Sequence, residues 1–494
     1  MTIEEGQSMM RRPKRIVNPG LETLIRGAGY SSLERFAEAI NHRGWQMHGV
    51  KTAYDHITVQ RWLAGSKSQN PDVVAAVLSD GWGVPVPVEV IWPQLRDGQP
   101  PEPPHRQPWA AGRTLDELGI FVRSDMLTRR ETLTEAVKAI SGPALLAPVA
   151  RWLGVPPGRL PGKDEGVRRI GVSDVEAIER STRYFAATDA ESGGALSREA
   201  AVGQLKYAVD LAQHASYSER TGNRLLAAIA ELSGLVGWLC HDSQMPGPAQ
   251  RYLTYGLQAA RESTDPRAPL LVISILSDMA QLMKWLGRPN TAVRLHDLAI
   301  NQLPSDRHRF NVLRAVLATK RVEEGLCFLG PSCVPEVQSA LSLSQDLYAQ
   351  ATNEDRATAV STWHRAIDMS EAELSAMASA TYLVLARDNP ALAAEVEKRV
   401  LHHLSNVGEG QGRNKVFSYI RLARVRFIAG EPEQASDDGD RAMDAAEHTA
   451  SAMIKRRLRE LLADSDPYTD VPRVTEFQDR LRTAISRLNW LAVP

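Results

Sequence analysis

Apolar side chains recur at helical spacing through most of the chain, whereas the alternating pattern of a β-strand is almost absent from its larger, carboxy-terminal part. The clearest short helix lies in TAYDHITVQRWLAG, residues 52–65. Val59, Trp62 and Leu63 fall at positions i, i+3 and i+4, which predicts one buried stripe on an amphipathic helix. We therefore expect an all-α protein.

Both ends of this helix carry recognisable signals. Asp55 can cap its start, and Gly65 can adopt the left-handed conformation that ends a helix. The preceding segment SLERFAEAI, residues 32–40, predicts another amphipathic helix capped by Ser32. Two short helices in this order predict a helix-turn-helix. The stretch at residues 41–55 is longer than the usual tight turn, so either the earlier helix is extended or a loop is inserted.

Two further helices are expected to complete this amino-terminal unit. NPGLETLIRGAG, residues 18–29, predicts a first helix that ends at Gly27. NPDVVAAVLSDGWG, residues 70–83, predicts a fourth helix with Pro71 in its first turn. We assign residues 1–95 to a helix-turn-helix domain that binds DNA.

Proline dominates the segment that follows. The run QPPEPPHRQPWAAG, residues 99–112, contains too much proline for a helix or a sheet. We assign residues 96–125 to a proline-rich linker and expect early proteolysis in the run at residues 99–112. Residues 126–215 are interpreted as a helical connecting region, because helical patterns recur in them.

The remaining residues, 216–494, carry a repeated pattern of small side chains. When Ala249, Ala292 and Ala435 are aligned, each has a small residue twelve positions earlier and another seven positions later. Those residues are Gly237, Ala280, Ala423, Gly256, Ala299 and Ala442. Small residues at such offsets let antiparallel helices pack closely, which is typical of a degenerate tetratricopeptide repeat. The pattern predicts a superhelix of helical pairs, with a non-repeating helical bundle as the alternative.

Composition and charge add one functional indication. The chain has 494 residues, of which 43% are hydrophobic and 24% charged, as expected for a globular protein with roughly two to four domains. Its formal net charge is −1, yet residues 11–67 contain ten lysine or arginine residues and four acidic ones. Such local positive charge attracts nucleic-acid phosphates. A solvated basic face without a partner is the alternative explanation.

Cysteine content and hydropathy bear on the cellular location. Cys240, Cys327 and Cys333 do not have the spacing of a disulfide framework or a zinc site. The amino terminus has no basic segment leading into an apolar one, and no apolar stretch approaches the length that spans a bilayer. We expect a cytoplasmic protein without a membrane partner.

Enzyme signatures are missing from the chain. It contains neither H-E-x-x-H nor G-x-x-x-x-G-K-[ST], and the glycines of residues 408–413 follow a helical pattern, which predicts a loop rather than a nucleotide cradle. His402 and His403 are adjacent, so on a helix their side chains point about 100° apart, a poor arrangement for chelating one metal. We therefore expect no enzyme activity, no catalytic residue, no metal and no cofactor.

Several stretches together resemble a known family. They are YDHITVQRWLAG at residues 54–65, the segments 189–205 and 230–260, LMKWLGRPNTA at residues 282–292, and IAGEPEQA at residues 428–435. The family consists of actinobacterial, Streptomyces-type transcriptional regulators that join an amino-terminal helix-turn-helix to a tetratricopeptide-like region, and it includes the negative regulator of sporulation and antibiotic production. The resemblance implies a regulator of development or secondary metabolism.

The opening stretch also resembles the recognition helix of phage-repressor-like domains. The structural positions of that helix match Thr58, Val59, Trp62 and Gly65. The resemblance places four candidates for base reading on the opposite face of the helix, and these are His56, Ile57, Gln60 and Arg61.

The chemistry of these side chains agrees with base reading. Arg61 can donate two parallel hydrogen bonds to guanine, Gln60 can pair with adenine, and Ile57 can contact a thymine methyl group. Phosphate contacts position a domain without reading sequence. The candidates for phosphate contacts are Ser32, Arg43, Lys51 and Lys67. For each base-reading candidate, an ordinary solvated helix position is the alternative.

These observations predict a homodimeric transcriptional regulator that binds double-stranded DNA. A peptide, small molecule or protein ligand would engage the groove of the helical repeats and alter the presentation of the two reading helices. The alternative is a tetratricopeptide-type scaffold for protein–protein interactions without direct sequence-specific DNA binding. The long stretch at residues 41–55 favours that alternative slightly.

Overall fold

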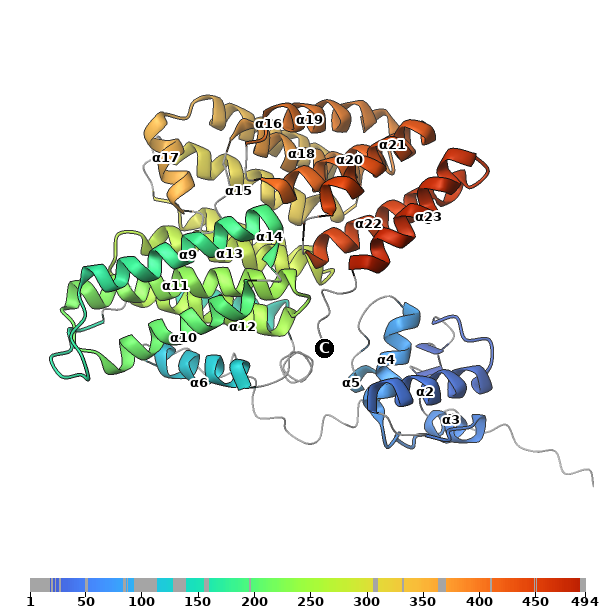
Figure 1. The fold of residues 1–494 in the computed structure, drawn as a ribbon, viewed down its shortest axis with the longest axis horizontal. Coiled ribbons are helices and arrows are strands. Elements are labelled where there is room, and N and C mark those ends of the chain that lie inside the picture. Colours follow the sequence, from blue (N-terminus) through green and yellow to red (C-terminus); the bar gives the residue numbers. More distant parts are fainter. Residues whose placement is uncertain are drawn as a thin grey trace, which may run out of the picture. The chain divides into compact units, whose positions relative to one another are not determined.

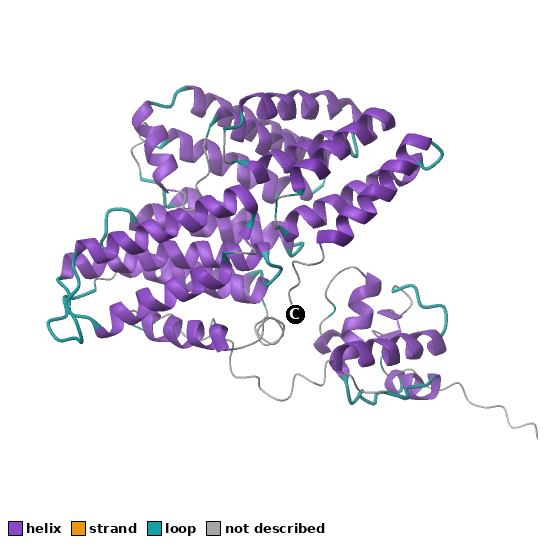
Figure 2. Cartoon of the chain, in the orientation of Figure 1, coloured by secondary structure: helices purple, strands orange, loops and turns teal. Residues whose placement is uncertain are grey.

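The chain divides into two compact units, Met1–Gln107 and Pro108–Pro494, and each is described by itself. The computed structural model describes residues 18, 21–22, 24–25, 28–48, 52–82, 86, 88–92, 113–127, 139–154, 160–194, 197–304, 310–330, 333–362, 370–408, 411–447, 449 and 451–488. Both units are helical, and within these ranges no strand is formed beyond two isolated bridges (Figures 1 and 2). The prediction of an all-α protein is confirmed.

The amino-terminal unit consists of short helices around one apolar core. They are α2 (Leu33–His48), α3 (His56–Leu63), α4 (Pro71–Trp82) and α5 (Val88–Ile91), and the described residues between 21 and 25 are also helical. The two central helices of the predicted helix-turn-helix are α2 and α3, and Pro71 begins α4 as expected. The predicted helix end at Gly27 lies outside the described residues.

Trp62 occupies the centre of this core. Its side chain is 2% exposed, and Val59 and Leu63 are buried beside it, which confirms the predicted apolar stripe. The Trp62 ring contacts Tyr54 and Trp92 edge to face, with ring centroids 5.2 and 6.0 Å apart. Such aromatic pairs add to the stabilisation that comes from burial of apolar surface. The three rings therefore stabilise the packing of α3 against the rest of the unit.

The second unit contains helices from α6 onward. They are α6 (Thr114–Leu127), α8 (Pro143–Gly154), α9 (Val172–Ser192), α10 (Arg198–His214), α11 (Glu219–Asp242), α12 (Pro246–Glu262), α13 (Ala268–Trp285), α14 (Pro289–Asn301), α15 (Asn311–Glu324), α16 (Val334–Ala349), α17 (Asn353–Thr362), α18 (Glu371–Ala386), α19 (Ala393–Asn406), α20 (Gly412–Ala429), α21 (Pro432–Ala446), α22 (Ala452–Ser465) and α23 (Pro472–Arg487). Short 3₁₀ turns follow α15 and α22 and precede α19.

Most of these helices form antiparallel pairs that stack into a superhelix (Figure 1). The pairs are α11/α12, α13/α14, α15/α16, α18/α19, α20/α21 and α22/α23. Each pair also packs against a neighbouring pair, because a single helical hairpin cannot bury its apolar faces alone. The predicted superhelix of helical pairs is therefore present.

Small residues lie where paired helices approach one another. A Cβ atom added to Gly237 would lie 2.8 Å from Leu253 Cγ, and one added to Gly256 would lie 3.1 Å from Ala230 O. Ala249, which packs in the same hairpin, is fully buried. The aligned alanines of α13/α14 and α20/α21 are fully buried as well. The small residues thus act at the helix contacts, as the sequence pattern predicted.

The predicted linker at residues 96–125 is too long. Its last part forms most of α6, in which Leu118 and Val122 are fully buried in the core of the second unit. The hydroxyl of Thr114 also donates a hydrogen bond of 2.5 Å to Glu262 on α12. The proline-rich composition ends at Gly112 and α6 begins at Thr114, so the burial of α6 decides the boundary. The proline-rich run itself lies outside the described residues.

The predicted boundary between a connecting region and a repeat domain at residues 215 and 216 has no counterpart in the core. Leu145 of α8, Ile178 of α9 and Leu205 of α10 belong to the same apolar cluster as Leu235 of α11. The helices before α11 are therefore part of the superhelical unit, because they cover the face that α11 and α12 would otherwise expose to water.

Helix α11 is apolar enough to resemble a membrane span. An 18-residue window within Glu219–Asp242 has a mean hydropathy of 1.3, but 94% of that window is buried inside the protein. Neighbouring helices cover it on several sides, including α9, α10, α12 and α13. Its apolar character is explained by its place in the core.

Candidate functional site

Helix α3 presents a polar surface on the side opposite its buried stripe. Ile57 is 44% exposed and Arg61 is exposed, while His56 and Gln60 are partly exposed. The structure therefore brings the four predicted base-reading side chains together on one accessible face. An exposed isoleucine between polar neighbours contributes little to the core, which leaves it available for an apolar contact.

The predicted signals at both ends of α3 are confirmed. Asp55 Oδ1 accepts hydrogen bonds from Thr58 Oγ1 at 2.7 Å and from the backbone N–H of Thr58 at 2.8 Å. These two bonds lower the pKa of Asp55, because they favour the ionised carboxylate. Gly65 follows the helix with φ of 104°, a conformation that only glycine adopts readily. The helix is thus held at both ends.

An acidic residue lies close to the polar face of α3. His56 Nδ1 is 3.7 Å from Glu34 Oε1; the Glu34 side chain is exposed and that of His56 is partly exposed. Hydrogen bonds from the backbone of Glu34 itself and from Ser32 lower the pKa of Glu34, so its carboxylate is ionised near neutral pH. A DNA phosphate placed beside this carboxylate would be repelled, so of the four candidates His56 has the least favourable position.

The four phosphate candidates have different environments. Ser32 Oγ accepts a hydrogen bond of 3.3 Å from the Arg35 backbone and acts as a cap of α2. Arg43 Nε is 3.4 Å from Asp80 Oδ2, so part of its charge is already neutralised. Lys67 is exposed beyond the end of α3, and Lys51 lies outside the described residues. Of the described candidates, Lys67 is the best placed for phosphate.

The long stretch before α3 is explained mainly by an extended α2, which continues to His48. The side chain of Asn41 in the middle of α2 then holds the backbone of Tyr54 through two hydrogen bonds of 2.8 Å. Gly44 of α2 lets the segment before α3 pack closely against this helix, because a Cβ atom at position 44 would lie only 3.2 Å from Thr52 Oγ1. Asn41 therefore helps to set where α3 starts, a role that the sequence pattern did not indicate.

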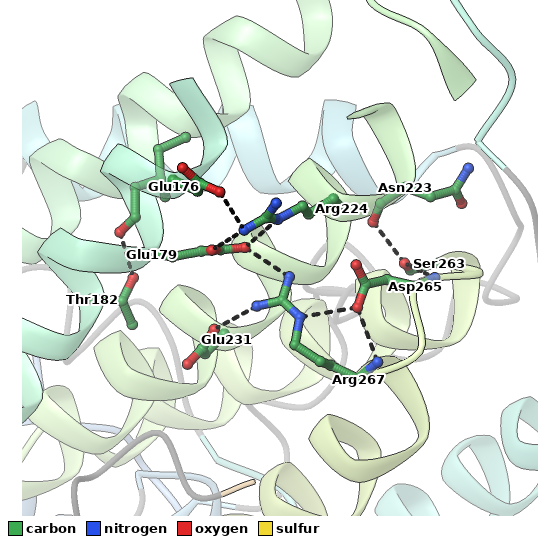
Figure 3. Close-up of polar contacts among 10 residues, drawn as sticks. Glu176, Glu179, Thr182, Asn223, Arg224, Glu231, Ser263, Asp265 and Arg267 are labelled. Carbon is green, nitrogen blue, oxygen red and sulfur yellow. Dashed lines mark hydrogen bonds and ion pairs between the residues drawn. The ribbon is translucent and has the colours of Figure 1, made fainter. Parts of the chain in front are cut away.

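Buried ion pairs in the second unit are a separate class of candidate site. Figure 3 shows Glu179 of α9 between Arg224 of α11 and Arg267 at the start of α13. Arg224 binds the Glu179 carboxylate with two hydrogen bonds of 3.0 and 2.8 Å, and Arg267 Nη2 is 2.8 Å from Glu179 Oε1. Burial by itself raises the pKa of Glu179, but these two arginines outweigh it and lower the pKa. This carboxylate is fully engaged, so the cluster joins helices rather than offering a reactive group.

A second buried cluster anchors α6. Arg198 on α10 donates two hydrogen bonds of 2.7 and 2.6 Å to the carboxylate of Asp125 on α6. Tyr252 on α12 donates a further hydrogen bond to the same carboxylate. Burial raises the pKa of the neighbouring Cys240 thiol to about 11, so this cysteine is protonated and unreactive near neutral pH.

The two adjacent histidines have different environments, as their spacing predicted. His402 is exposed, whereas His403 is fully buried. His403 Nε2 lies 3.4 Å from Glu373 Oε1, and its Nδ1 lies 2.8 Å from Ser418 Oγ. Across the described ranges, no group of three or more histidine, cysteine or acidic side chains is arranged to hold a metal. His403 is a structural residue that connects α19 to α18 and α20.

Residues 21–91 match the family model described as the SP15 N-terminal domain. The matched segment begins and ends at Leu21 and Ile91, two fully buried residues of the amino-terminal core, and it contains all of α2, α3, α4 and α5. The match thus coincides with one folding unit and does not extend to the superhelix. No curated protein matches the chain.

Proposed function

We propose that the protein is a DNA-binding transcriptional regulator, in which the amino-terminal unit contacts DNA and the helical-repeat unit senses a peptide, small molecule or protein partner. The observation that carries the proposal is the accessible face of α3, on which Ile57, Gln60 and Arg61 lie opposite the buried Val59 and Trp62. The resemblance to actinobacterial regulators supports a role in development or secondary metabolism in the cytoplasm.

The side chains on this face suit the major groove. Arg61 can bind guanine O6 and N7 through both arms of its guanidinium, and Gln60 can pair with adenine. Ile57, one turn before Arg61, can contact a thymine methyl group. Lys67 adds a contact to the phosphate backbone. In a homodimer, two copies of α3 would read half-sites roughly 34 Å apart along the duplex.

The proposal is tested by selecting bound sequences from a random DNA pool with the full chain. Binding of the selected duplex and a scrambled duplex of equal length is then measured across a salt series. We expect specific binding together with affinity that falls as salt rises, because each neutralised phosphate releases counterions. Failure to enrich any sequence, together with no binding to either duplex at low salt, would refute the proposal.

A scaffold without sequence-specific DNA binding is the second candidate function. The observation that favours it is the set of charged side chains on the first helices of the stacked pairs, which surround cavities between α13, α15, α18, α20 and α22. Superhelices of this kind bind partners along such surfaces. Ligand binding by the second unit in a chain that does not bind DNA would support the scaffold instead.

A further inference from the structure

Arg421 on α20 is a charged side chain without a charged partner. Its Nη1 donates one long hydrogen bond of 3.4 Å to Ser418 Oγ, and within the described part of the chain no carboxylate forms an ion pair with it. Its side chain is only partly exposed. A guanidinium has five N–H donors, so most of the hydrogen-bonding capacity of Arg421 is available for another group.

The neighbouring cations, by contrast, are paired. Lys284 Nζ lies 2.9 Å from Glu323 Oε1, and Lys320 Nζ lies 2.6 Å from Glu324 Oε1. These pairs leave Glu323 and Glu324 engaged on α15. Each of these two carboxylates therefore already has a lysine partner, and neither forms an ion pair with Arg421.

Between α20 and α22, Arg424, Arg456 and Arg457 share two carboxylates, Glu460 and Asp464. Glu460 Oε2 lies 2.7 Å from both Arg424 Nη1 and Arg457 Nη1. Burial is the main cause that lowers the pKa of Arg421. Glu323 opposes it, Arg457 and Arg424 lower the pKa further, and Glu373 also raises it, so the net shift is downward. Removing water from an uncompensated cation is costly, so an added anion at Arg421 would recover that energy.

Arg421 also lines two cavities that open to solvent. Two adjoining cavities of about 130 and about 270 Å³ share five lining residues, which are Lys284, Glu323, Phe417, Arg421 and Arg457. The larger cavity has an apolar wall formed by Phe328, Leu383, Val384 and Ile420. A polar end with excess positive charge thus adjoins an apolar wall, which is the common composition of a small-molecule site.

We propose that this cavity binds a small amphipathic anion whose phosphate or carboxylate group pairs with Arg421 and whose apolar body lies against Phe417 and Leu383. The proposal deepens the ligand-sensing part of the proposed function and rests on it. Helices α13, α15, α18, α20 and α22 all contribute to the two cavities, so a bound anion would connect helices from five successive pairs. Ligand binding would therefore stabilise one curvature of the superhelix.

Three probes of similar size distinguish binding of a phosphate, a carboxylate and a neutral group. Phenyl phosphate and phenylacetate carry the two kinds of anionic group, and phenylacetamide is the neutral control. Binding to the full chain is measured by calorimetry and by the shift of the melting temperature, without DNA. We expect at least one anion to bind and to raise the melting temperature, since a ligand that binds only the folded state stabilises it by mass action. Phenylacetamide should have no measurable effect.

The variants Arg421→Met and Arg421→Lys test the assigned side chain, with Arg482→Met as the control. Arg482 on α23 is exposed and pairs with Asp479 at 2.9 Å, and it does not line either cavity. Arg421→Met should weaken anion binding by about tenfold or more, because a charge-assisted pair is lost, and Arg421→Lys should have an intermediate effect. Without ligand, Arg421→Met should melt at or above the wild-type temperature, because it removes a desolvated cation without a partner.

Each contrary outcome overturns the proposal. The proposal is wrong if neither anion binds, if phenylacetamide binds as tightly as the anions, or if Arg421→Met binds the anions as tightly as wild type. A ligand-free Arg421→Met variant that melts well below wild type would assign Arg421 a structural role instead. Anion binding by a chain that does not bind DNA would refute only the regulator proposal, whereas DNA binding without anion binding would refute only this inference.

Discussion

Asn41 holds Tyr54 through two hydrogen bonds, one donated by Asn41 Nδ2 to Tyr54 O and one donated by Tyr54 N to Asn41 Oδ1, each 2.8 Å long. The pair joins the middle of α2 to the residue before the Asp55 cap of α3. The ring of Tyr54 also contacts Trp62. One side chain thus connects the backbone before the predicted reading helix to the aromatic core beneath it.

Asn41→Ala should loosen α3 without unfolding the second unit. Loss of two partly buried hydrogen bonds should destabilise the amino-terminal unit by about 1 to 3 kcal/mol, because the Tyr54 backbone groups lose their partners. The measurement is hydrogen exchange in peptides that cover residues 54–65 of the full chain. Glu38→Ala, at an exposed position of the same helix, is the control and should leave exchange unchanged. Equal exchange in both variants would contradict the role given to Asn41.

Trp62→Ala should unfold the amino-terminal unit. Truncation of a buried tryptophan costs about 3 to 5 kcal/mol, and a unit of this size has little more than that to lose. Trp45→Ala is the matched control, because Trp45 lies on α2 and is 59% exposed whereas Trp62 is 2% exposed. Susceptibility to protease within residues 21–91 distinguishes the two. A resistant Trp62→Ala variant would place this side chain outside the core.

Arg61→Ala and Lys67→Ala should affect DNA binding differently. Loss of a base contact at Arg61 should weaken binding to a selected operator by about tenfold to a hundredfold and leave binding to a scrambled duplex nearly unchanged. Lys67→Ala should weaken binding to both duplexes and reduce the salt dependence of the affinity by about one counterion, because a lysine that contacts phosphate does not read sequence. If Arg61→Ala lowered the affinity for both duplexes equally, Arg61 would contact the DNA backbone rather than a base.

Limited proteolysis should separate the two compact units. Trypsin should cut first at Arg106, within the proline-rich run at residues 99–112, because such a sequence is expected to have few internal backbone partners. The packing of α6 predicts that sites inside Thr114–Leu127 resist cleavage for longer. Mass spectrometry of the first fragments identifies the earliest cleavage sites. Early cuts within α6 would contradict its place in the core of the second unit.

The buried cluster around Glu324 predicts a dependence of stability on pH. Burial by itself raises the pKa of Glu324, but Lys320 and His296 outweigh it and hold the pKa at about 2, below its usual value of 4.5. A lowered pKa stabilises the folded state above pH 4.5, and this contribution is lost as pH falls toward about 2.

Glu324→Gln tests this dependence. Removal of one partner from a buried ion pair should cost about 3 to 5 kcal/mol at neutral pH. Urea unfolding at several pH values should show the difference from wild type shrinking below pH 4.5. Asp479→Asn, which changes an exposed ion pair on α23, is the control and should show little difference at any pH. A difference that is constant with pH would contradict the assignment.

Local sequence determined several features of this protein. The spacing of Val59, Trp62 and Leu63 is enough to place α3 and its buried face, and Asp55 and Gly65 mark its ends through short-range hydrogen bonding and backbone conformation. The offsets of small residues likewise predicted the close pairing of helices. These signals are readable because they act over one or two helical turns or repeat along the chain.

Only the tertiary structure decided the extent of the linker and the sites that depend on distant partners. Helix α6 is a weak signal in the sequence, yet it packs against α10 and α12, and its Asp125 and Thr114 form hydrogen bonds with those two helices. Asn41 and Arg421 carry no distinguishing pattern either. The significance of Asn41 comes from Tyr54, and that of Arg421 from how the superhelix distributes carboxylates among its arginines. Burial and charge compensation are properties of packed helices, so they cannot be assigned to a residue before its neighbours in space are known.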